Sequence, residues 1–298
     1  MLYPDFNELV ELKTKISSLK LLSNRLIKSL MTGNYFSPFR GHGLEFAEVR
    51  QYVAGDDVRK IDWRVTARTG TPHIKLFTEE RERTALIVVD VNQSMCFGTR
   101  GTFKSIQAAR CASLIAWCAN KNSNKVGALL FGNVENGIEF LRPTRSRRSL
   151  WKMIKILSQK TEDKHQAITL DKALEFTNTV VSRSNIVFII SDFMNINDNL
   201  SKQLRYLSVH CQVVLLSVND PADMNINSAG DILFSSDKLE RLYVNTNSAA
   251  GQKAYEKQWL ERCAKLNEIS VNLGIHNISL STNGDVYFDL FYGLKKTG

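Results

Sequence analysis

A chain of 298 residues is long enough for one large domain or for a domain with an appendage. Its 43% hydrophobic and 23% charged residues are ordinary globular proportions, which excludes a disordered or a fibrous chain. The net charge of +9 favours acidic proteins, nucleic acid or anionic lipid as partners, although the basic residues are scattered along the chain.

The N-terminal segment predicts an amphipathic helix. It carries early acidic residues and no apolar run, so it lacks the pattern of a secretory signal. Its apolar residues recur at spacings of three, four and seven. Such a stripe packs most often on its own domain, and a membrane surface or a partner is the alternative. The stripe consists of Leu9, Leu12, Ile16, Leu19, Leu26 and Leu30.

Between Gly33 and Arg83 the sequence predicts a small β-rich element of turns and hairpins rather than helices. Gly, Pro and Asp clusters separate short alternating runs such as residues 73–77. Opposite charges alternate around an aromatic residue here, which fits either salt-bridged turns or a docking surface with Arg and Trp hot spots. The candidate partner-binding residues are Arg50, Asp56, Asp57, Arg59, Asp62, Trp63 and Arg68.

After Thr84 apolar runs alternate with helical segments, which predicts an α/β fold with a doubly wound, mostly parallel sheet. Continuous Val- and Ile-rich runs are typical of strands buried on both faces. We expect residues 1–83 to hold the N-terminal helix and the β-rich segment, and residues 84–298 to form the α/β domain with a C-terminal extension. The predicted strands are 86–89, 126–131, 186–190, 213–218 and a last β-like segment, 275–291, and the predicted helices are 102–121, 147–160, 170–181, 197–209 and 249–271.

No segment predicts a membrane span, because the longest apolar stretch, 106–119, falls short of the roughly 20 residues required and contains Arg110. Five cysteines without a CxxC pair argue against a disulfide framework and a zinc ribbon. We expect Cys111 and Cys118 to be buried, inert thiols on one helix face. These features favour the reducing cytoplasm, and peripheral contact with the inner membrane stays open.

Polar residues follow two of the predicted strands. Ligands of open parallel sheets bind outside the carboxyl ends of the strands, so these residues are candidates for a site. Asp90, Asn92 and Ser94 alternate after the first strand, and Asp192 follows the third. With a hydroxyl from Thr169, or from its rival Thr144, these oxygens suit Mg²⁺, or Mn²⁺. The alternative is that these residues only cap helices and close turns.

This constellation resembles the metal-ion-dependent adhesion site of von Willebrand factor A-type domains, whose motif is Asp-x-Ser-x-Ser, then Thr, then Asp. Asn92 stands where that family has its first Ser, so the oxygen offered there belongs to an amide on a longer side chain. The resemblance implies that an acidic side chain of a partner completes the coordination of the ion.

A longer resemblance covers most of the chain from Gly41 onward. It rests on residues 41–46 (GHGLEF), 50–63 (RQYVAGDDVRKIDW), Ala67-Arg68, Glu80, Ser191-Asp192-Phe193 and Asp220-Pro221. These segments resemble the bacterial family called domain of unknown function 58. The resemblance implies a von Willebrand factor A-like, non-enzymatic adaptor that works with a MoxR-type AAA+ ATPase in the assembly or maturation of a client protein.

Two other functions remain as alternatives. A metal-dependent hydrolase could use the same carboxylates to activate water, although no candidate general base with a positioned partner is visible. A nucleic-acid-binding module could use a basic cluster at the start of a helix, but no aromatic residues interleave with it, so nucleic acid is the weaker expectation. The cluster comprises Arg142, Arg145, Arg147, Arg148, Lys152 and Lys155.

Overall fold

The chain is described by a computed structural model in two compact units. One unit comprises Asn34–Glu82, and the other comprises Met1–Gly33 together with Arg83–Gly298. The residues whose structure is described are 3–18, 44–79, 84–159, 168–182, 185–225, 230–236 and 240–296.

The larger unit is built on a six-stranded sheet of order β10-β7-β6-β3-β4-β5. Its strands run parallel except for the edge strand β5, which is antiparallel to β4. The central strands β3, β4, β6 and β7 are buried along nearly their whole length, as their continuous apolar sequences predict. The strands are β3 (Thr84–Val91), β4 (Lys125–Gly132), β5 (Ile138–Thr144), β6 (Asn185–Ser191), β7 (Gln212–Asn219) and β10 (His276–Ser281).

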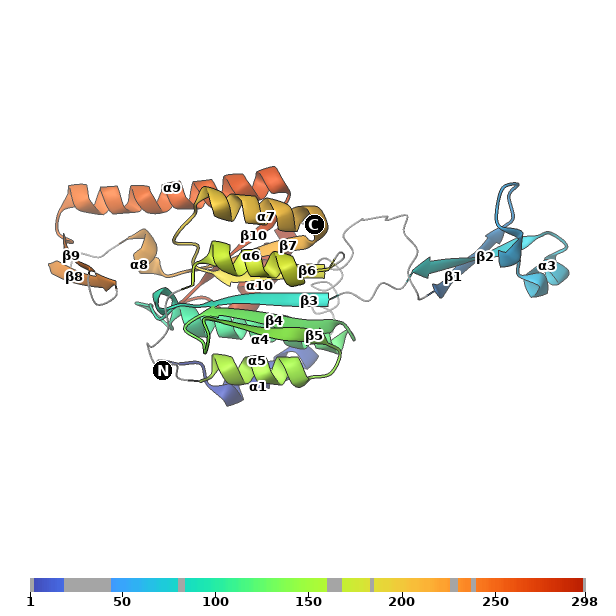
Figure 1. Cartoon of the computed structure of the whole chain (residues 1–298), viewed down its shortest axis with the longest axis horizontal. Coiled ribbons are helices and arrows are strands. Elements are labelled where there is room, and N and C mark those ends of the chain that lie inside the picture. Colours follow the sequence, from blue (N-terminus) through green and yellow to red (C-terminus); the bar gives the residue numbers. More distant parts are fainter. Residues whose placement is uncertain are drawn as a thin grey trace. The chain divides into compact units, whose positions relative to one another are not determined.

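Helices cover both faces of this sheet (Figure 1). Alternate residues of β3 feed the two cores: Ile87 and Val89 face α1, α4, α5 and α10, whereas Val88 faces α6, α7 and α9. The predicted doubly wound α/β fold is therefore confirmed. The helices are α1 (Phe6–Ser18), α4 (Lys104–Lys121), α5 (Arg148–Leu157), α6 (Leu170–Val180), α7 (Asp198–His210), α8 (Pro221–Met224), α9 (Ala249–Leu273) and α10 (Val286–Lys296). No described helix is long and apolar enough to cross a bilayer.

The C-terminal segment differs from the sequence prediction. The predicted β-like segment 275–291 is wrong beyond its first part, because β10 ends at Ser281 and α10 begins at Val286. The Asp285 side chain accepts a hydrogen bond from the Tyr287 backbone N–H at 2.8 Å, which satisfies a free donor at the helix start. Val286 and Leu290, four residues apart, are both buried, so their spacing is helical. The sequence reading also missed β5 and a hairpin of β8 (Asp231–Ser236) and β9 (Glu240–Asn245).

Helix α1 belongs to the α/β unit. The predicted boundary at residue 83 grouped this helix with the β-rich segment, but the structure packs it on α4 and α5. Leu9, Leu12 and Ile16 are buried in the core, as expected for a stripe that packs on its own domain. The Trp117 indole N–H donates to the Leu9 carbonyl at 3.2 Å. The predicted continuation of the stripe through Leu19, Leu26 and Leu30 lies outside the described residues.

The smaller unit is an antiparallel pair of strands, β1 (Leu44–Gln51) and β2 (His73–Glu79). Its connection contains a 3₁₀ turn, η1 (Val58–Lys60), and a helix, α3 (Trp63–Thr69), so the expectation of no helix here is wrong. The Asp62 carboxylate accepts from the backbone N–H groups of Arg64 and Val65, and Gly70 closes the helix in a left-handed conformation. These two caps allow a helix only seven residues long.

Leu9→Ala is expected to lower the free energy of unfolding by about 2–5 kcal/mol, because it leaves a cavity between α1 and α4. Denaturant unfolding of the full chain measures this change. Leu260→Ala is the matched control: that side chain is 49% exposed on α9, and its loss should change stability by only about 0.5 kcal/mol. Equal effects of the two substitutions would show that α1 does not contribute to the core in solution.

Candidate functional site

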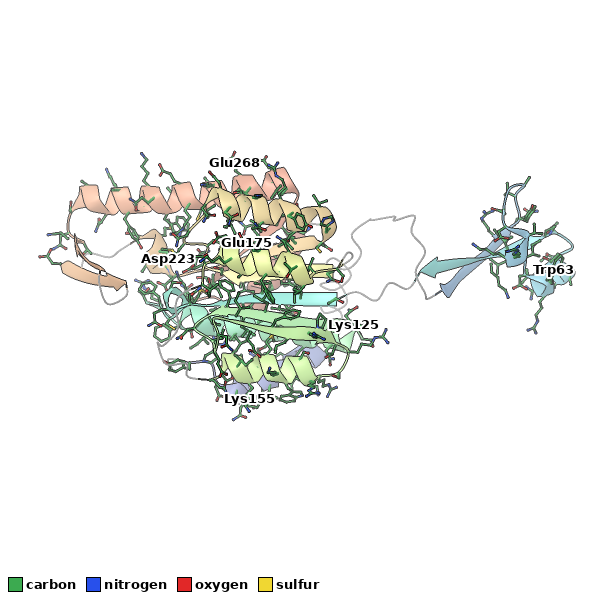
Figure 2. The ribbon with its side chains drawn as sticks, in the orientation of Figure 1. Trp63, Lys125, Lys155, Glu175, Asp223 and Glu268 are labelled. Atoms are coloured by element: carbon green, nitrogen blue, oxygen red, sulfur yellow. The ribbon has the colours of Figure 1, made fainter. Side chains whose placement is uncertain are left out.

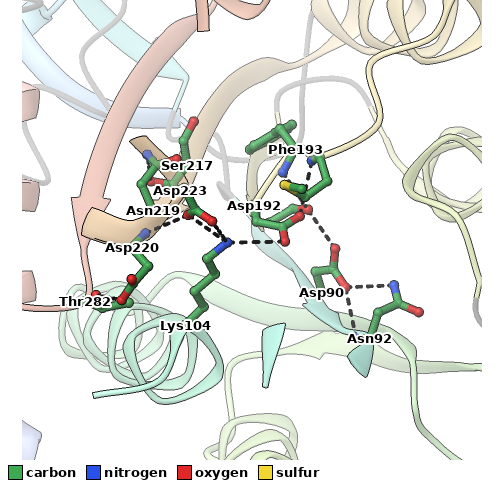
Figure 3. A network of polar contacts seen from close by, with 12 residues as sticks. Asp90, Asn92, Lys104, Asp192, Phe193, Ser217, Asn219, Asp220, Asp223 and Thr282 are labelled. Atoms are coloured by element: carbon green, nitrogen blue, oxygen red, sulfur yellow. Dashed lines mark hydrogen bonds and ion pairs between the residues drawn. The ribbon is translucent and has the colours of Figure 1, made fainter. Parts of the chain in front are cut away.

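Acidic side chains gather at the carboxyl edge of the sheet (Figure 3). Asp90 lies near the end of β3, Asp192 directly follows β6, and Asp220 directly follows β7. Because these parallel strands are neighbours, their carboxyl ends bring the three loops together. All three side chains are at least 94% buried, so each must find its partners inside the protein.

Asp90 accepts hydrogen bonds at both carboxylate oxygens. Its Oδ1 accepts from the Asn92 backbone N–H at 3.0 Å and from the Asn92 side-chain amide at 2.8 Å. Its Oδ2 accepts from the Ser191 hydroxyl at 2.7 Å. Burial, together with the nearby charge of Asp192, still raises the pKa of Asp90 to about 7.

Asp192 has fewer partners. Its Oδ1 accepts from the Met194 backbone N–H at 3.2 Å, whereas its buried Oδ2 has no hydrogen-bond donor in the described part of the chain. Burial raises the pKa of Asp192, and the positive charge of Lys104, 3.7 Å from Oδ2, opposes this rise. The next residue, Phe193, adopts a left-handed backbone with φ of 48° although it is not glycine. Such strain is concentrated at functional turns.

Lys104 supplies a buried positive charge that the sequence reading missed. It is 2% exposed in the first turn of α4, and its Nζ lies 2.8 and 3.0 Å from the two oxygens of Asp223. Asp223 in turn accepts the backbone N–H of Asp220 in a capping box that opens α8. A lysine at the start of a mostly apolar helix was the available signal, but its partner lies 119 residues away.

Asp220 joins three segments of the chain. Its carboxylate accepts from the backbone and hydroxyl of Thr99 and from the hydroxyl of Thr282. Burial raises the pKa of Asp220, but the hydrogen bonds from Thr282 and Thr99 outweigh it and hold the pKa below its usual range. A carboxylate in this position therefore fastens the loop before α4 and the loop after β10 to the end of β7.

None of the other predicted ligand hydroxyls, those of Ser94, Thr169 and Thr144, is hydrogen-bonded to Asp90 or Asp192 within the described part of the chain. Ser94 is exposed in the turn η2 (Gln93–Met95), and Thr169 is exposed, with its hydroxyl bonded to Asp171. Thr144 lies at the opposite edge, since it pairs with Val126 at the start of β4. Of the two threonines, only Thr169 follows a residue that contacts the site, because the Ile168 carbonyl accepts from the Asn92 amide at 2.9 Å.

Asn92 presents the wrong group for a metal ion. Its amide nitrogen donates to Asp90 (Figure 3) and to the Ile168 carbonyl. Its buried Oδ1 lies beside Gly132 and has no hydrogen-bond donor among the described residues. A cation requires oxygen atoms there rather than N–H groups. Within the described ranges, no group of three or more histidine, cysteine or acidic side chains is placed to hold an ion. The residues present therefore do not fit Mg²⁺ in this arrangement, and the metal site stays a prediction.

The candidate partner-binding residues all lie in the smaller unit, where they divide into two groups. Asp56 pairs with Arg50 at 2.7 Å, Asp57 caps η1, and Asp62 caps α3. The hydrogen bond from Arg50 lowers the pKa of Asp56, and the backbone N–H of Val65 lowers that of Asp62. These four residues build the unit, whereas the remaining three are exposed: Arg59, Trp63 and Arg68.

Cys111 and Cys118 are buried, as expected, and burial raises the pKa of both thiols, to about 12 for Cys118. Thiols in this state are poor nucleophiles.

Gly132→Ala is expected to destabilise the protein by on the order of 2 kcal/mol or more, because φ of 111° strains any other residue. An added Cβ would also lie 2.6 Å from the Asn92 Oδ1. Denaturant unfolding tests this. The control is Gly251→Ala on α9, where an added Cβ would meet no atom closer than 3.6 Å. This substitution should leave the free energy of unfolding unchanged or raise it. A tolerated Gly132→Ala would mean that the Asn92 conformation is not fixed.

The raised pKa of Asp90 predicts a pH-dependent stability. Between about pH 4 and 7 the folded state holds a proton that the unfolded state has released, so the free energy of unfolding falls as pH rises through this window. From about pH 5 to 8 this contribution should decrease by about 2–3 kcal/mol. Asp90→Asn should remove it, which unfolding curves of both proteins across this range would show. Parallel pH profiles would indicate that Asp90 keeps an ordinary pKa.

Comparisons with known proteins give both sequence relatives and solved structures that are similar to this chain. Uncharacterized proteins from Mycobacterium bovis and Mycobacterium tuberculosis are 29% identical over 228 residues, which is 75% of this chain and 70% of theirs. The solved structure of the conserved hypothetical protein BatB from Bacteroides thetaiotaomicron is 14% identical with a TM-score of 0.44, covering 72% of this chain and 98% of that one. A von Willebrand factor type A structure from Catenulispora acidiphila is 9% identical with a TM-score of 0.37, covering 75% and 43%.

A family model described as "Protein of unknown function DUF58" matches residues 48–265, which include most of the smaller unit and the acidic residues Asp90, Asp192 and Asp220. The mostly parallel sheet with helices on both faces is the doubly wound α/β arrangement that the sequence predicts. The chain therefore belongs to the DUF58 family.

Proposed function

We propose that this protein is a non-enzymatic adaptor that binds a MoxR-type AAA+ ATPase and serves it in the assembly or maturation of a client protein. The observation that carries the proposal is Trp63, a large aromatic side chain that is 70% exposed at the start of α3 (Figure 2). Exposed tryptophan and arginine are the residue types that most often dominate binding energy at protein interfaces.

The charges around Trp63 favour an acidic partner surface. The carboxylates of Asp56, Asp57 and Asp62 are engaged in ion pairs or caps inside the smaller unit. In contrast, four exposed basic side chains have no ion pair within the described part of the chain. These are Arg59, Lys60, Arg64 and Arg68.

Two exposed valines extend the apolar part of the same unit. Val53 is 61% exposed and Val58 is 60% exposed, although both belong to a unit whose few buried side chains include Ile74. Apolar and basic groups together suit a partner that offers an apolar contact within an acidic surface.

The carboxyl edge of the sheet supports binding rather than hydrolysis. Both oxygens of Asp90 accept hydrogen bonds from the protein itself, so this carboxylate is not free to activate water.

Trp63→Ala should weaken binding to the MoxR-type AAA+ ATPase of the same organism by on the order of thirtyfold, the effect of losing about 2 kcal/mol. Arg59→Glu and Arg68→Glu should slow association and reduce its dependence on salt, because they replace attraction with repulsion. Titration calorimetry and surface-binding kinetics with the full chain measure both effects.

Tyr206→Ala is the matched control, since Tyr206 is 54% exposed on α7 in the larger unit and should leave affinity unchanged. Equal affinity of the wild type and Trp63→Ala, or no saturable binding of the ATPase at all, would refute the proposal. Binding of nucleic acid instead, with steep salt dependence and no effect of Trp63, would favour the alternative based on the basic cluster.

A further inference from the structure

We propose that the Lys104 ammonium takes the place of a divalent cation at the carboxyl edge, so that this protein holds its strand-end loops together without a metal. The proposal concerns ion dependence only. It does not rest on the proposed function, because an adaptor can bind its partner with or without an ion.

The first argument is charge. Asp90 near the end of β3, Asp192 directly after β6 and Asp223 in α8, which follows β7, are each at least 94% buried. Buried carboxylates require positive charge or several hydrogen-bond donors. Among the described residues, Lys104 is the only buried lysine or arginine, and it contacts two of these three carboxylates.

The second argument is position. Figure 3 shows the Lys104 side chain extending from α4 to lie between Asp192 and Asp223. Its backbone N–H donates to the Phe97 carbonyl at 2.9 Å, and its Nζ lies 5.6 Å from the centre of the Phe97 ring. The ammonium is therefore held by the helix start and by the loop before it, and it is not a free surface group.

The third argument is exclusion. Mg²⁺ bound to the unpartnered Oδ2 of Asp192 would lie about 2.1 Å from that oxygen and hence within about 6 Å of the Lys104 Nζ. Two like charges at that distance in a buried site repel strongly. The resident ammonium thus disfavours the ion for which the carboxylates are otherwise suited.

The fourth argument is Asn92, which removes the remaining need for an ion at Asp90. Its backbone and side-chain N–H groups both donate to the Asp90 Oδ1. Asp90 is therefore stabilised by donors, and Asp192 and Asp223 by an ammonium. Asn92 and Lys104 together perform the electrostatic role of a bound cation.

The test is a titration of Mg²⁺ and Mn²⁺ into the full chain, with melting temperatures measured in millimolar ion and in chelator. The wild type should show no saturable heat of binding and the same melting temperature in both conditions. Lys104→Met should melt at lower temperature in chelator, and Mg²⁺ should raise its melting temperature. Adding Asn92→Ser to this variant should increase the response to the ion.

Lys172→Met is the matched control, because Lys172 is exposed on α6 and its loss should create no response to ions. If Lys104→Met does not fold, Lys104→Met/Asp223→Asn removes both charges of the pair and should still gain the response. Saturable Mg²⁺ binding by the wild type that Asp90→Ala abolishes would overturn the proposal. A folded Lys104 variant that gains no response to Mg²⁺ or Mn²⁺ would overturn it as well.

Discussion

The structure of the larger unit depends on how it neutralises carboxylates that are buried at one edge of its sheet. An unpaired buried charge is among the most unfavourable features a protein can contain. Here Asp90, Asp192, Asp220 and Asp223 are all at least 94% buried. Each of these carboxylates binds hydrogen-bond donors from a different part of the chain. The donors lie in loops at this edge of the sheet and at the start of α4.

Several local features follow from this constraint. Gly132 has a backbone that leaves room for the Asn92 amide, and Phe193 accepts a strained turn whose N–H donates to Ser191. The Ser191 hydroxyl in turn donates a hydrogen bond to Asp90. The cost of strain at single residues is offset by donors for a buried carboxylate, and such an arrangement is rigid. A rigid edge is a suitable platform for loops that bind a partner.

The two units manage charge in different ways. The larger unit hides its carboxylates and closes one face of the sheet with α1, whose leucines sit against α4. The smaller unit uses its aspartates as caps and ion-pair partners, which leaves arginines and Trp63 exposed. Buried charges therefore identify the important residues of the larger unit, and exposed side chains identify those of the smaller unit. The sequence shows the charged and aromatic residues of both units, but only the structure shows which of them are buried and which are exposed.

The sequence by itself determined the buried strands, most helices, and the positions of Asp90 near the end of β3 and of Asp192 directly after β6. Hydrophobic periodicity and continuous apolar runs are local signals. They are enough to predict a helix or strand whose structure depends mainly on its own residues. The sequence analysis did not predict the short helix α3 or the start of α10. At both places a capping aspartate stabilises the helix start, and the hydropathy pattern of the segment does not show this.

Only the tertiary structure decided the partners of the site. Lys104 meets Asp223 across 119 residues and Asp220 meets Thr99 across 121, and no spacing rule connects such positions. Strand direction placed Thr144 at the far edge, because β5 is antiparallel. The orientation of the Asn92 amide depends on the Ile168 carbonyl, which precedes α6, and on Gly132 at the end of β4. Residue types near strand ends can thus suggest a cation site, but the donors and charges that occupy it are set by contacts between distant segments.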